Sequence, residues 1–132
     1  MQFAGFNYIA VLVAAIAAFG FGAVWYMTLS KQWMTAAGIT ERPESSAGPF
    51  ILTFLCQLVM AWVLAGVIGH LGEITVVRSI ISALFVWAGF VATTMIVNHR
   101  FQGAPWTLTL IDAGHWLGTL VIMGLVIGLF GV

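Results

Sequence analysis

Long apolar runs separated by short polar stretches dominate this chain, and they predict four membrane-spanning helices. A helix needs about 20 mostly apolar residues, at 1.5 Å of rise each, to cross the hydrocarbon core of a bilayer. Four runs reach that length, and they cover residues 7–29, 49–70, 77–98 and 107–130. The pattern therefore indicates an all-α membrane protein.

The ends of these runs carry side chains that favour a membrane surface. The first run has Tyr8 at one end and Trp25 and Tyr26 at the other, and aromatic residues are enriched at both membrane interfaces. Arg78 lies near the start of the third run, where its long side chain can reach the surface. The first run lacks a basic segment before it and exceeds the apolar length of a signal peptide, so we expect it to be retained.

The connections are short, so successive helices should run antiparallel and form an up-down four-helix bundle. We expect one integral membrane domain over residues 1–132. The longest connection, residues 30–48, has room for a short interfacial helix over residues 31–38 that presents Trp33 and Met34 to lipid.

Loop cations predict the orientation of the bundle. Lys31, Arg42 and Arg100 lie in connections 30–48 and 99–106, which share one side, whereas Arg78 alone lies on the other side. Cytoplasmic loops carry the excess of Lys and Arg. We therefore expect these two connections in the cytoplasm and both termini outside.

Composition excludes several classes of protein. The chain is 62% hydrophobic and 6% charged, whereas a soluble domain carries about a quarter charged residues. Its net charge is zero and its four basic residues are scattered, so no nucleic-acid partner is expected. The single cysteine, Cys56, excludes a disulfide within the chain. The expected surrounding is the lipid bilayer.

Small residues recur at helical spacing and predict close helix–helix contacts. In lipid, helices associate through close packing of small side chains rather than through hydrophobic burial. These repeats indicate contact faces, either within one chain or between chains. They are Ala10, Ala14, Ala18 and Gly22 in the first run, Ala61, Ala65 and Gly69 in the second, and the pairs Gly114–Gly118 and Gly124–Gly128 in the fourth.

Asp112 and His115 stand out because they lie inside the fourth apolar run. An ionised aspartate at a bilayer centre costs about 2.5–3.5 kcal/mol on insertion scales. At about 100° per residue, the two side chains point only about 60° apart, with Thr119 between them in angle. We expect this polar stripe to face the interior of the bundle.

Antiparallel packing indicates which side chains share the half-bilayer of Asp112. Arg100 is the expected charge partner of Asp112, and Asn98 or His99 can complete the hydrogen bonding. The candidate ligand-binding or proton-relay residues are Asp112, His115, Arg100, Asn98, His99, Gln57, Trp25 and Tyr26.

Each of these candidates has a structural alternative. The Asp112–Arg100 pair is either a buried ion pair that fixes helix register or a ligand or proton site. His115 is either a hydrogen-bonded structural histidine or a proton carrier. Trp25 and Tyr26 are either interfacial anchors or part of the site.

No cofactor, metal or catalytic residue is predicted. Asp112 and His115 supply only two metal ligands, and His70 lies at the opposite face of the membrane. His99 and His115 differ in depth by about 12 Å, which is too far apart for two axial ligands of one haem.

Two long stretches, NYIAVLVAAIAAFGFGAVWYMTLSKQWMTAAGIT and NHRFQGAPWTLTLIDAGHWLGTLVIMGLVIG, resemble the bacterial membrane proteins grouped as the domain of unknown function 1761 family. The resemblance covers essentially the whole chain and is carried by Gly22, Trp25, Tyr26, Trp33, Asp112 and His115. It implies a small integral protein of the bacterial inner membrane without a soluble catalytic domain. That family has no assigned activity, so no residue role follows from it.

Three functions fit these patterns. The first is a small transporter-like or channel-like bundle, expected to be homo-oligomeric, that binds a small ligand or a proton at the Asp112, His115 and Arg100 cluster. The second is a structural or accessory membrane subunit whose polar cluster only locks helix packing. The third is a lipid- or quinone-modifying membrane enzyme with His115 as general base, ranked last because no nucleophile lies beside it.

Overall fold

The computed structural model describes residues 7–41 and 46–131, and within these ranges it contains helices and no strand. The elements are α1 (Tyr8–Thr28), α2 (Ser30–Ala37), α3 (Ala47–Leu71), α4 (Val76–Val86), the π-helical segment η2 (Trp87–Ala92), α5 (Thr93–Phe101) and α6 (Trp106–Phe130). The prediction of an all-helical chain is confirmed.

Within the described ranges, four helices are long and apolar enough to cross a membrane. They are α1, α3, the continuous helix Val76–Phe101 formed by α4, η2 and α5, and α6. Their bounds lie within a few residues of the predicted ones. The largest difference is at the end of the third helix, which continues through Phe101 instead of ending at residue 98. His99 and Arg100 therefore belong to the last turn of α5 and not to a connection.

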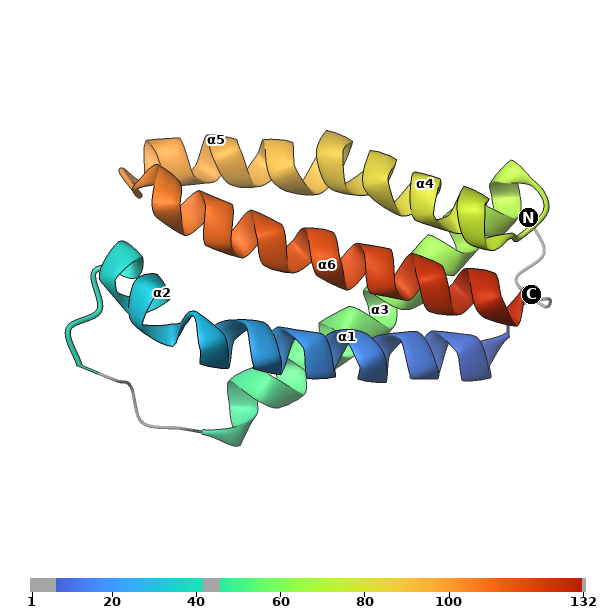
Figure 1. Ribbon diagram of the computed structural model, residues 1–132, viewed down its shortest axis with the longest axis horizontal. Coiled ribbons are helices and arrows are strands. Elements are labelled where there is room, and N and C mark those ends of the chain that lie inside the picture. Colours follow the sequence, from blue (N-terminus) through green and yellow to red (C-terminus); the bar gives the residue numbers. More distant parts are fainter. Residues whose placement is uncertain (1–6, 42–45, 132) are drawn as a thin grey trace.

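The arrangement places α6 in the middle of the molecule (Figure 1). In this view α1 lies on one side of α6, the helix formed by α4 and α5 lies on the other side, and α3 crosses behind them. The chain runs from right to left along α1, returns along α3, runs left again through α4 and α5, and returns along α6 (Figure 1). Helix α6 packs most extensively against α1 and α4, while α3 packs mainly against α1.

Helix ends follow ordinary local chemistry. The side chain of Asn7 accepts a hydrogen bond from the backbone N–H of Ala10, and that of Thr75 accepts one from Arg78. Such caps satisfy amides that have no partner inside the helix. Gly38 ends α2 in the left-handed region at φ 73°, where glycine carries no steric penalty.

Small residues allow the close packing of α1 against α3. Ala10, Ala14 and Ala18 are buried on α1, and Ala61 and Ala65 are buried on α3. The predicted role of these residues in helix contacts is confirmed within one chain. Gly69, at the end of the same repeat on α3, is exposed. The repeat therefore stops packing before the helix ends.

Two glycines of α6 perform the same role against α4. A Cβ at Gly124 would lie 2.8 Å from the backbone oxygen of Ser79, and one at Gly128 would lie 2.6 Å from the Cα of Val76. Such distances are shorter than real Cβ contacts. The backbones of α4 and α6 can approach this closely only because both positions lack a side chain.

The π-helical segment η2 interrupts the third helix near its middle. A π turn changes the direction of the following side chains and leaves carbonyls with altered partners. Thr93 donates its hydroxyl to the carbonyl of Gly89, and Thr94 donates to that of Phe90. The two hydroxyls thus satisfy carbonyls of the irregular segment, which the apolar pattern alone did not predict.

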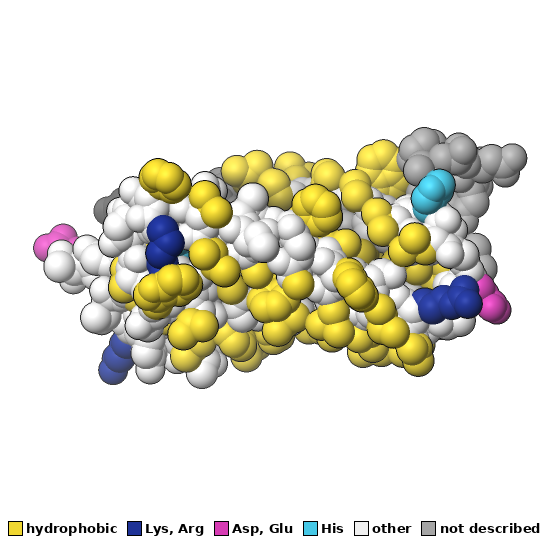
Figure 2. Space-filling view, turned by 90° about the horizontal axis from the view of Figure 1, so that it is seen from above, with side chains coloured by type: hydrophobic (Ala, Val, Ile, Leu, Met, Phe, Trp, Pro, Cys, Tyr) yellow, Lys and Arg dark blue, Asp and Glu magenta, His cyan; other side chains and the backbone are white. Residues whose placement is uncertain are grey.

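On the face shown in Figure 2, hydrophobic side chains occur along the length of the molecule and charged side chains lie toward its two ends. The exposed apolar residues include Phe85 and Phe90 at 75% and Phe101 at 91%. A soluble monomer rarely exposes so large an apolar surface. Arg42, one of the cations used to predict orientation, lies outside the described residues.

Helix α2 occupies most of the region where the sequence indicated a short helix. Trp33, which we expected to face lipid, is half-buried and packs edge-on against Tyr26, with 6.1 Å between ring centroids. The location of α2 at a membrane surface stays a prediction.

Candidate functional site

The C-terminal end of α1 meets the first turns of α6 through two hydrogen bonds. The hydroxyl of Tyr26 donates to Asp112 Oδ1 at 2.7 Å, and the indole N–H of Trp25 donates to the carbonyl of Ile111 at 3.1 Å. A short O–H···O bond to a carboxylate is among the stronger hydrogen bonds in proteins. Two candidates that were adjacent in sequence, Trp25 and Tyr26, therefore contact α6 directly.

The second oxygen of Asp112 faces His99. The distance from His99 Nε2 to Asp112 Oδ2 is 4.0 Å, and the two side chains are 13% and 20% exposed. This distance is longer than a hydrogen bond, and it becomes an ion pair only when the imidazole carries a proton.

The sequence predicted an ion pair between Arg100 and Asp112, and this prediction is wrong for the structure described. Within residues 7–41 and 46–131, the side chain that approaches Asp112 from α5 is His99. Neighbouring residues on a helix point about 100° apart, so when α5 directs His99 toward Asp112 it directs Arg100 elsewhere. The guanidinium of Arg100 lies over the ring of Trp106, 3.6 Å from its centroid.

Thr109 connects His99 with Arg100. Its Oγ1 lies 2.7 Å from Arg100 NH2 and 2.7 Å from His99 Nδ1. A guanidinium can only donate, so Thr109 Oγ1 accepts from Arg100. The hydrogen bond between Thr109 Oγ1 and His99 Nδ1 runs in one direction or the other according to which ring nitrogen of His99 carries the proton.

His115 is enclosed by aromatic rings at the interface between α1 and α6. Its ring centroid lies 4.8 Å from Tyr26, 4.6 Å from Trp116 and 6.2 Å from Phe21. The residue is 4% exposed. Its Nε2 lies 3.4 Å from the hydroxyl of Thr119, and its buried Nδ1 has no hydrogen-bond partner among the described residues.

Three glycines make room for these rings. A Cβ at Gly22 would lie 2.7 Å from His115 Nε2, one at Gly114 would lie 3.0 Å from Trp25, and one at Gly118 would overlap the ring of Phe21. Gly22 on α1 thus admits the histidine of α6, and the glycines of α6 admit the aromatic rings of α1. Gly22 and Trp25 of α1 therefore fit against His115 and Gly114 of α6.

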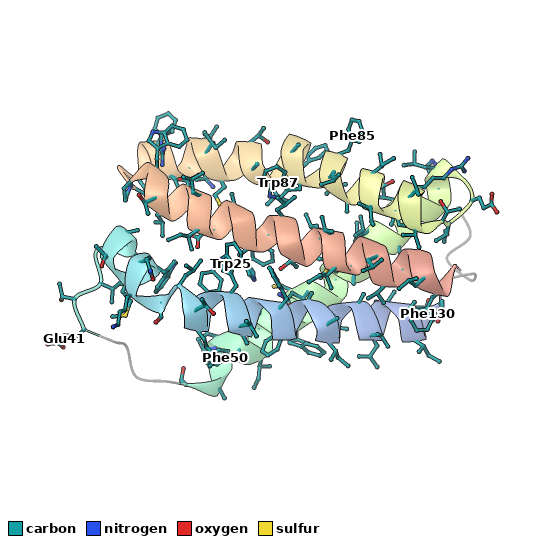
Figure 3. The ribbon with its side chains drawn as sticks, viewed as in Figure 1. Trp25, Glu41, Phe50, Phe85, Trp87 and Phe130 are labelled. Carbon is teal, nitrogen blue, oxygen red and sulfur yellow. The ribbon has the colours of Figure 1, made fainter. Side chains whose placement is uncertain are left out.

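Two tryptophans flank the same part of α6 from opposite sides (Figure 3). Trp25 comes from α1 and donates to the carbonyl of Ile111, and Trp87 comes from η2 and donates to that of Ala113 at 2.9 Å. The accepting carbonyls come directly before and after Asp112. The two bonds hold this segment of α6 between its neighbours.

An open groove of about 410 Å³ lies between α3, α6 and the η2–α5 part of the third helix. Its polar lining residues are Thr94, Asn98, His99 and Gln102, and its apolar ones are Met60, Phe90, Val91, Met95 and Trp116. Volumes of 300–1,000 Å³ are typical of small-molecule sites. His99 belongs both to this groove and to the contact with Asp112, so it connects the two.

The structure brings some of the predicted residues together and separates others. Tyr26, His99 and Asp112 form one contact chain, and Asn98 lines the groove. Gln57 is buried on α3, and its side-chain oxygen has no hydrogen-bond partner in the described ranges. It lies one turn before Met60, the residue of α3 that lines the groove.

Thr109, Trp87 and Gln102 were not selected from the sequence. Thr109 could have been selected from the sequence, because it precedes Asp112 by three residues and so shares its face of the helix. Nothing in the sequence indicated Trp87, since its role depends on the π-helical segment.

Comparison with known proteins gives a family and no activity. A family model described as "Protein of unknown function (DUF1761)" matches residues 9–128. No match was found among curated proteins or among solved structures.

Proposed function

Because the chain belongs to the DUF1761 family, whose description assigns no activity, we propose a function from the site itself. We propose a multi-pass membrane protein of the transporter or channel type. In this proposal a small ligand binds in the groove between α3, α5 and α6, and a proton held between His99 and Asp112 is coupled to that binding. His99 carries the proposal, because it lines the groove and faces the carboxylate.

The coupling follows from the two states of His99. The His99 imidazole lies 4.0 Å from the Asp112 carboxylate, and an imidazole that carries a proton would be attracted to it as an ion pair. A movement of the imidazole toward Asp112 alters the wall of the groove. Ligand and proton then affect each other's binding, and this effect is reciprocal by thermodynamic necessity.

Three other titratable or charged groups lie near this pair, on α1, α5 and α6. Tyr26 from α1 donates to Asp112, Arg100 from α5 binds the same hydroxyl as His99, and His115 from α6 packs on Tyr26. In lipid, ionisable side chains in such a setting are usually functional.

We further propose that the four helices cross the bacterial inner membrane in an antiparallel up-down bundle. Both termini would lie outside, and the connections 30–48 and 102–105 would lie in the cytoplasm. A homo-oligomer is part of this proposal, since four helices enclose little space and a pathway forms more easily between copies.

Proton flux into liposomes tests the proposed function. The purified protein is reconstituted with a pH-sensitive dye inside, a pH gradient is imposed, and its decay is followed. The wild type should dissipate the gradient faster than protein-free liposomes, and Asp112→Asn should return the rate to the protein-free level. Glu41→Gln removes an exposed carboxylate outside the cluster and should retain wild-type flux. Wild-type flux in Asp112→Asn would contradict the proposal.

A structural role is the second candidate, and one observation favours it. Both carboxylate oxygens of Asp112 face protein groups, Oδ1 the hydroxyl of Tyr26 and Oδ2 the imidazole of His99. Such a cluster can lock helix packing without binding anything. This alternative predicts that Asp112→Asn and His115→Ala lower the unfolding temperature in detergent while no variant alters proton flux.

A further inference from the structure

The groove changes in chemical character along its length. Its lining on the third helix extends from Phe90 to Gln102, which at 1.5 Å per residue spans about 18 Å. Phe90 and Val91 form one end, whereas Asn98 and Gln102 form the other. Because Asn98 and Gln102 are four residues apart on one helix, their amides share a face. This gradient fits an elongated molecule with a polar head and an apolar tail.

The charge of the lining restricts the head of such a molecule. Among the residues that the structure describes, no Lys, Arg, Asp or Glu lines the groove, and His99 is the one titratable side chain in its lining. Recognition of lipid phosphates relies on clustered Lys and Arg, which the described lining lacks, and an ammonium head would meet no carboxylate in that lining. The groove therefore favours an uncharged head that accepts hydrogen bonds from amide groups.

The remaining lining residues favour a flat ring. Trp116 supplies an aromatic surface from α6, and Met60 and Met95 supply polarizable sulfur atoms from the facing helices. Aromatic rings stack on indole, and thioethers make favourable contacts with ring edges. A ring with carbonyl acceptors would place them at Asn98 and Gln102 and its apolar chain along Phe90.

From these features we propose that the groove binds a neutral, tailed ring compound of the quinone type. Its head would lie at Asn98 and Gln102 beside His99, and its tail would run toward η2. This inference rests on the proposed function in that it takes the groove as the ligand site, and it adds the class of ligand.

Fluorescence quenching with decylubiquinone tests the inference in detergent solution. The quinone should quench the wild-type protein saturably, and Trp116→Phe should remove much of that quenching, whereas Trp33→Phe on α2 should retain it. The double variant Asn98→Leu/Gln102→Met should bind about tenfold more weakly or worse, since it loses two neutral hydrogen bonds. Gln32→Met on α2 is its matched control and should bind as the wild type does. Thermal unfolding of each variant verifies that it is folded.

Two results would overturn the inference. One is equal quenching in the wild type and Trp116→Phe, and the other is unchanged affinity in the folded double variant. Displacement of decylubiquinone by phosphatidylglycerol would instead assign the groove to a phospholipid and would also overturn it. Proton flux distinguishes the two proposals. If proton flux depends on Asp112 but the quinone does not bind, only the proposed class of ligand is wrong. If the quinone binds but proton flux does not depend on Asp112, the proposed coupling to a proton is wrong.

Discussion

Tyr26 is the residue whose contribution to the site is most easily isolated, because Phe removes only its hydroxyl. Loss of the 2.7 Å bond to Asp112 leaves a carboxylate oxygen without its donor. Hydrogen bonds to charged groups contribute about 1.5–3 kcal/mol. Tyr26→Phe should therefore lower the unfolding temperature in detergent.

A double-mutant cycle verifies that this loss is due to Asp112. Combining Tyr26→Phe with Asp112→Asn should cost less than the sum of the two single changes, because both remove the same contact. Additive losses would indicate that the two side chains do not interact in the folded protein.

Gly22 offers a second test at this scale, with a matched control two residues away. A Cβ at Gly22 would lie 2.7 Å from His115 Nε2, whereas one at Gly20 would meet nothing within 4 Å. Overpacking costs about 1–3 kcal/mol, while alanine in an open helix position gains about 0.5–1 kcal/mol over glycine. Gly22→Ala should destabilise the protein and Gly20→Ala should not. Equal unfolding temperatures for the two variants would contradict the described packing of His115.

The sequence predicted some of these residue contacts and not others, for a geometric reason. Antiparallel helices place Tyr26 and Asp112 at the same end, so their proximity follows from topology. Choosing between His99 and Arg100 requires the direction of each side chain, which changes by about 100° per residue. Because the third helix was predicted to end before His99, the sequence assigned no direction to the side chains of His99 and Arg100. The charge of Arg100 then favoured the wrong partner.

Among the elements, α6 is the one that the others surround, and its glycines determine how closely they approach. Its first half receives rings from α1 at Gly114 and Gly118, and its second half meets the backbone of α4 at Gly124 and Gly128. The sequence predicted these positions as contact faces, since small residues at four-residue spacing are typical of them.

Gly128→Ala tests the crossing of α4 and α6. The added Cβ would lie 2.6 Å from the Cα of Val76, and backbone atoms cannot rotate away as a side chain can. We expect a loss of about 1–3 kcal/mol in unfolding free energy, measured in detergent with a chemical denaturant. Gly20→Ala, where nothing lies within 4 Å, is again the control. A tolerated Gly128→Ala would show that the two helices are further apart.

The π-helical segment η2 was not predictable from its residues. WAGFVA fits an ordinary apolar helix, and its altered register depends on partners elsewhere. Trp87 reaches the carbonyl of Ala113 on α6, and Thr93 satisfies the carbonyl of Gly89. The sequence shows which side chains can donate hydrogen bonds, but not which carbonyls they reach in the folded protein. The same limit applies to the groove, whose walls come from three separate helices.

For the whole molecule, length and hydropathy were sufficient to predict four helices and their approximate bounds. Each run is long enough to span a bilayer, and the polar connections between runs are short. Orientation follows from the positions of only a few cations and needs direct measurement.

Cysteine labelling measures that orientation. In a Cys56→Ser background, single cysteines replacing Gln102 and Glu73 are treated with a membrane-impermeant maleimide in intact cells. Glu73 lies between α3 and α4 and should be labelled from outside, whereas Gln102 follows α5 and should react only after the membrane is opened. The opposite pattern would reverse the proposed topology, and labelling of both from outside would contradict the four-span arrangement.

The proposed function depends on His99 facing Asp112, and nitrogen NMR of the histidine side chains tests this contact. Protein labelled at histidine nitrogen is reconstituted in bilayers, and its signals are compared between the wild type and Asp112→Asn. We predict that the substitution changes the chemical shifts of the His99 ring nitrogens and leaves those of His70, at the far end of α3, unchanged. Unchanged His99 signals in Asp112→Asn would contradict the proposed sharing of a proton between the two side chains.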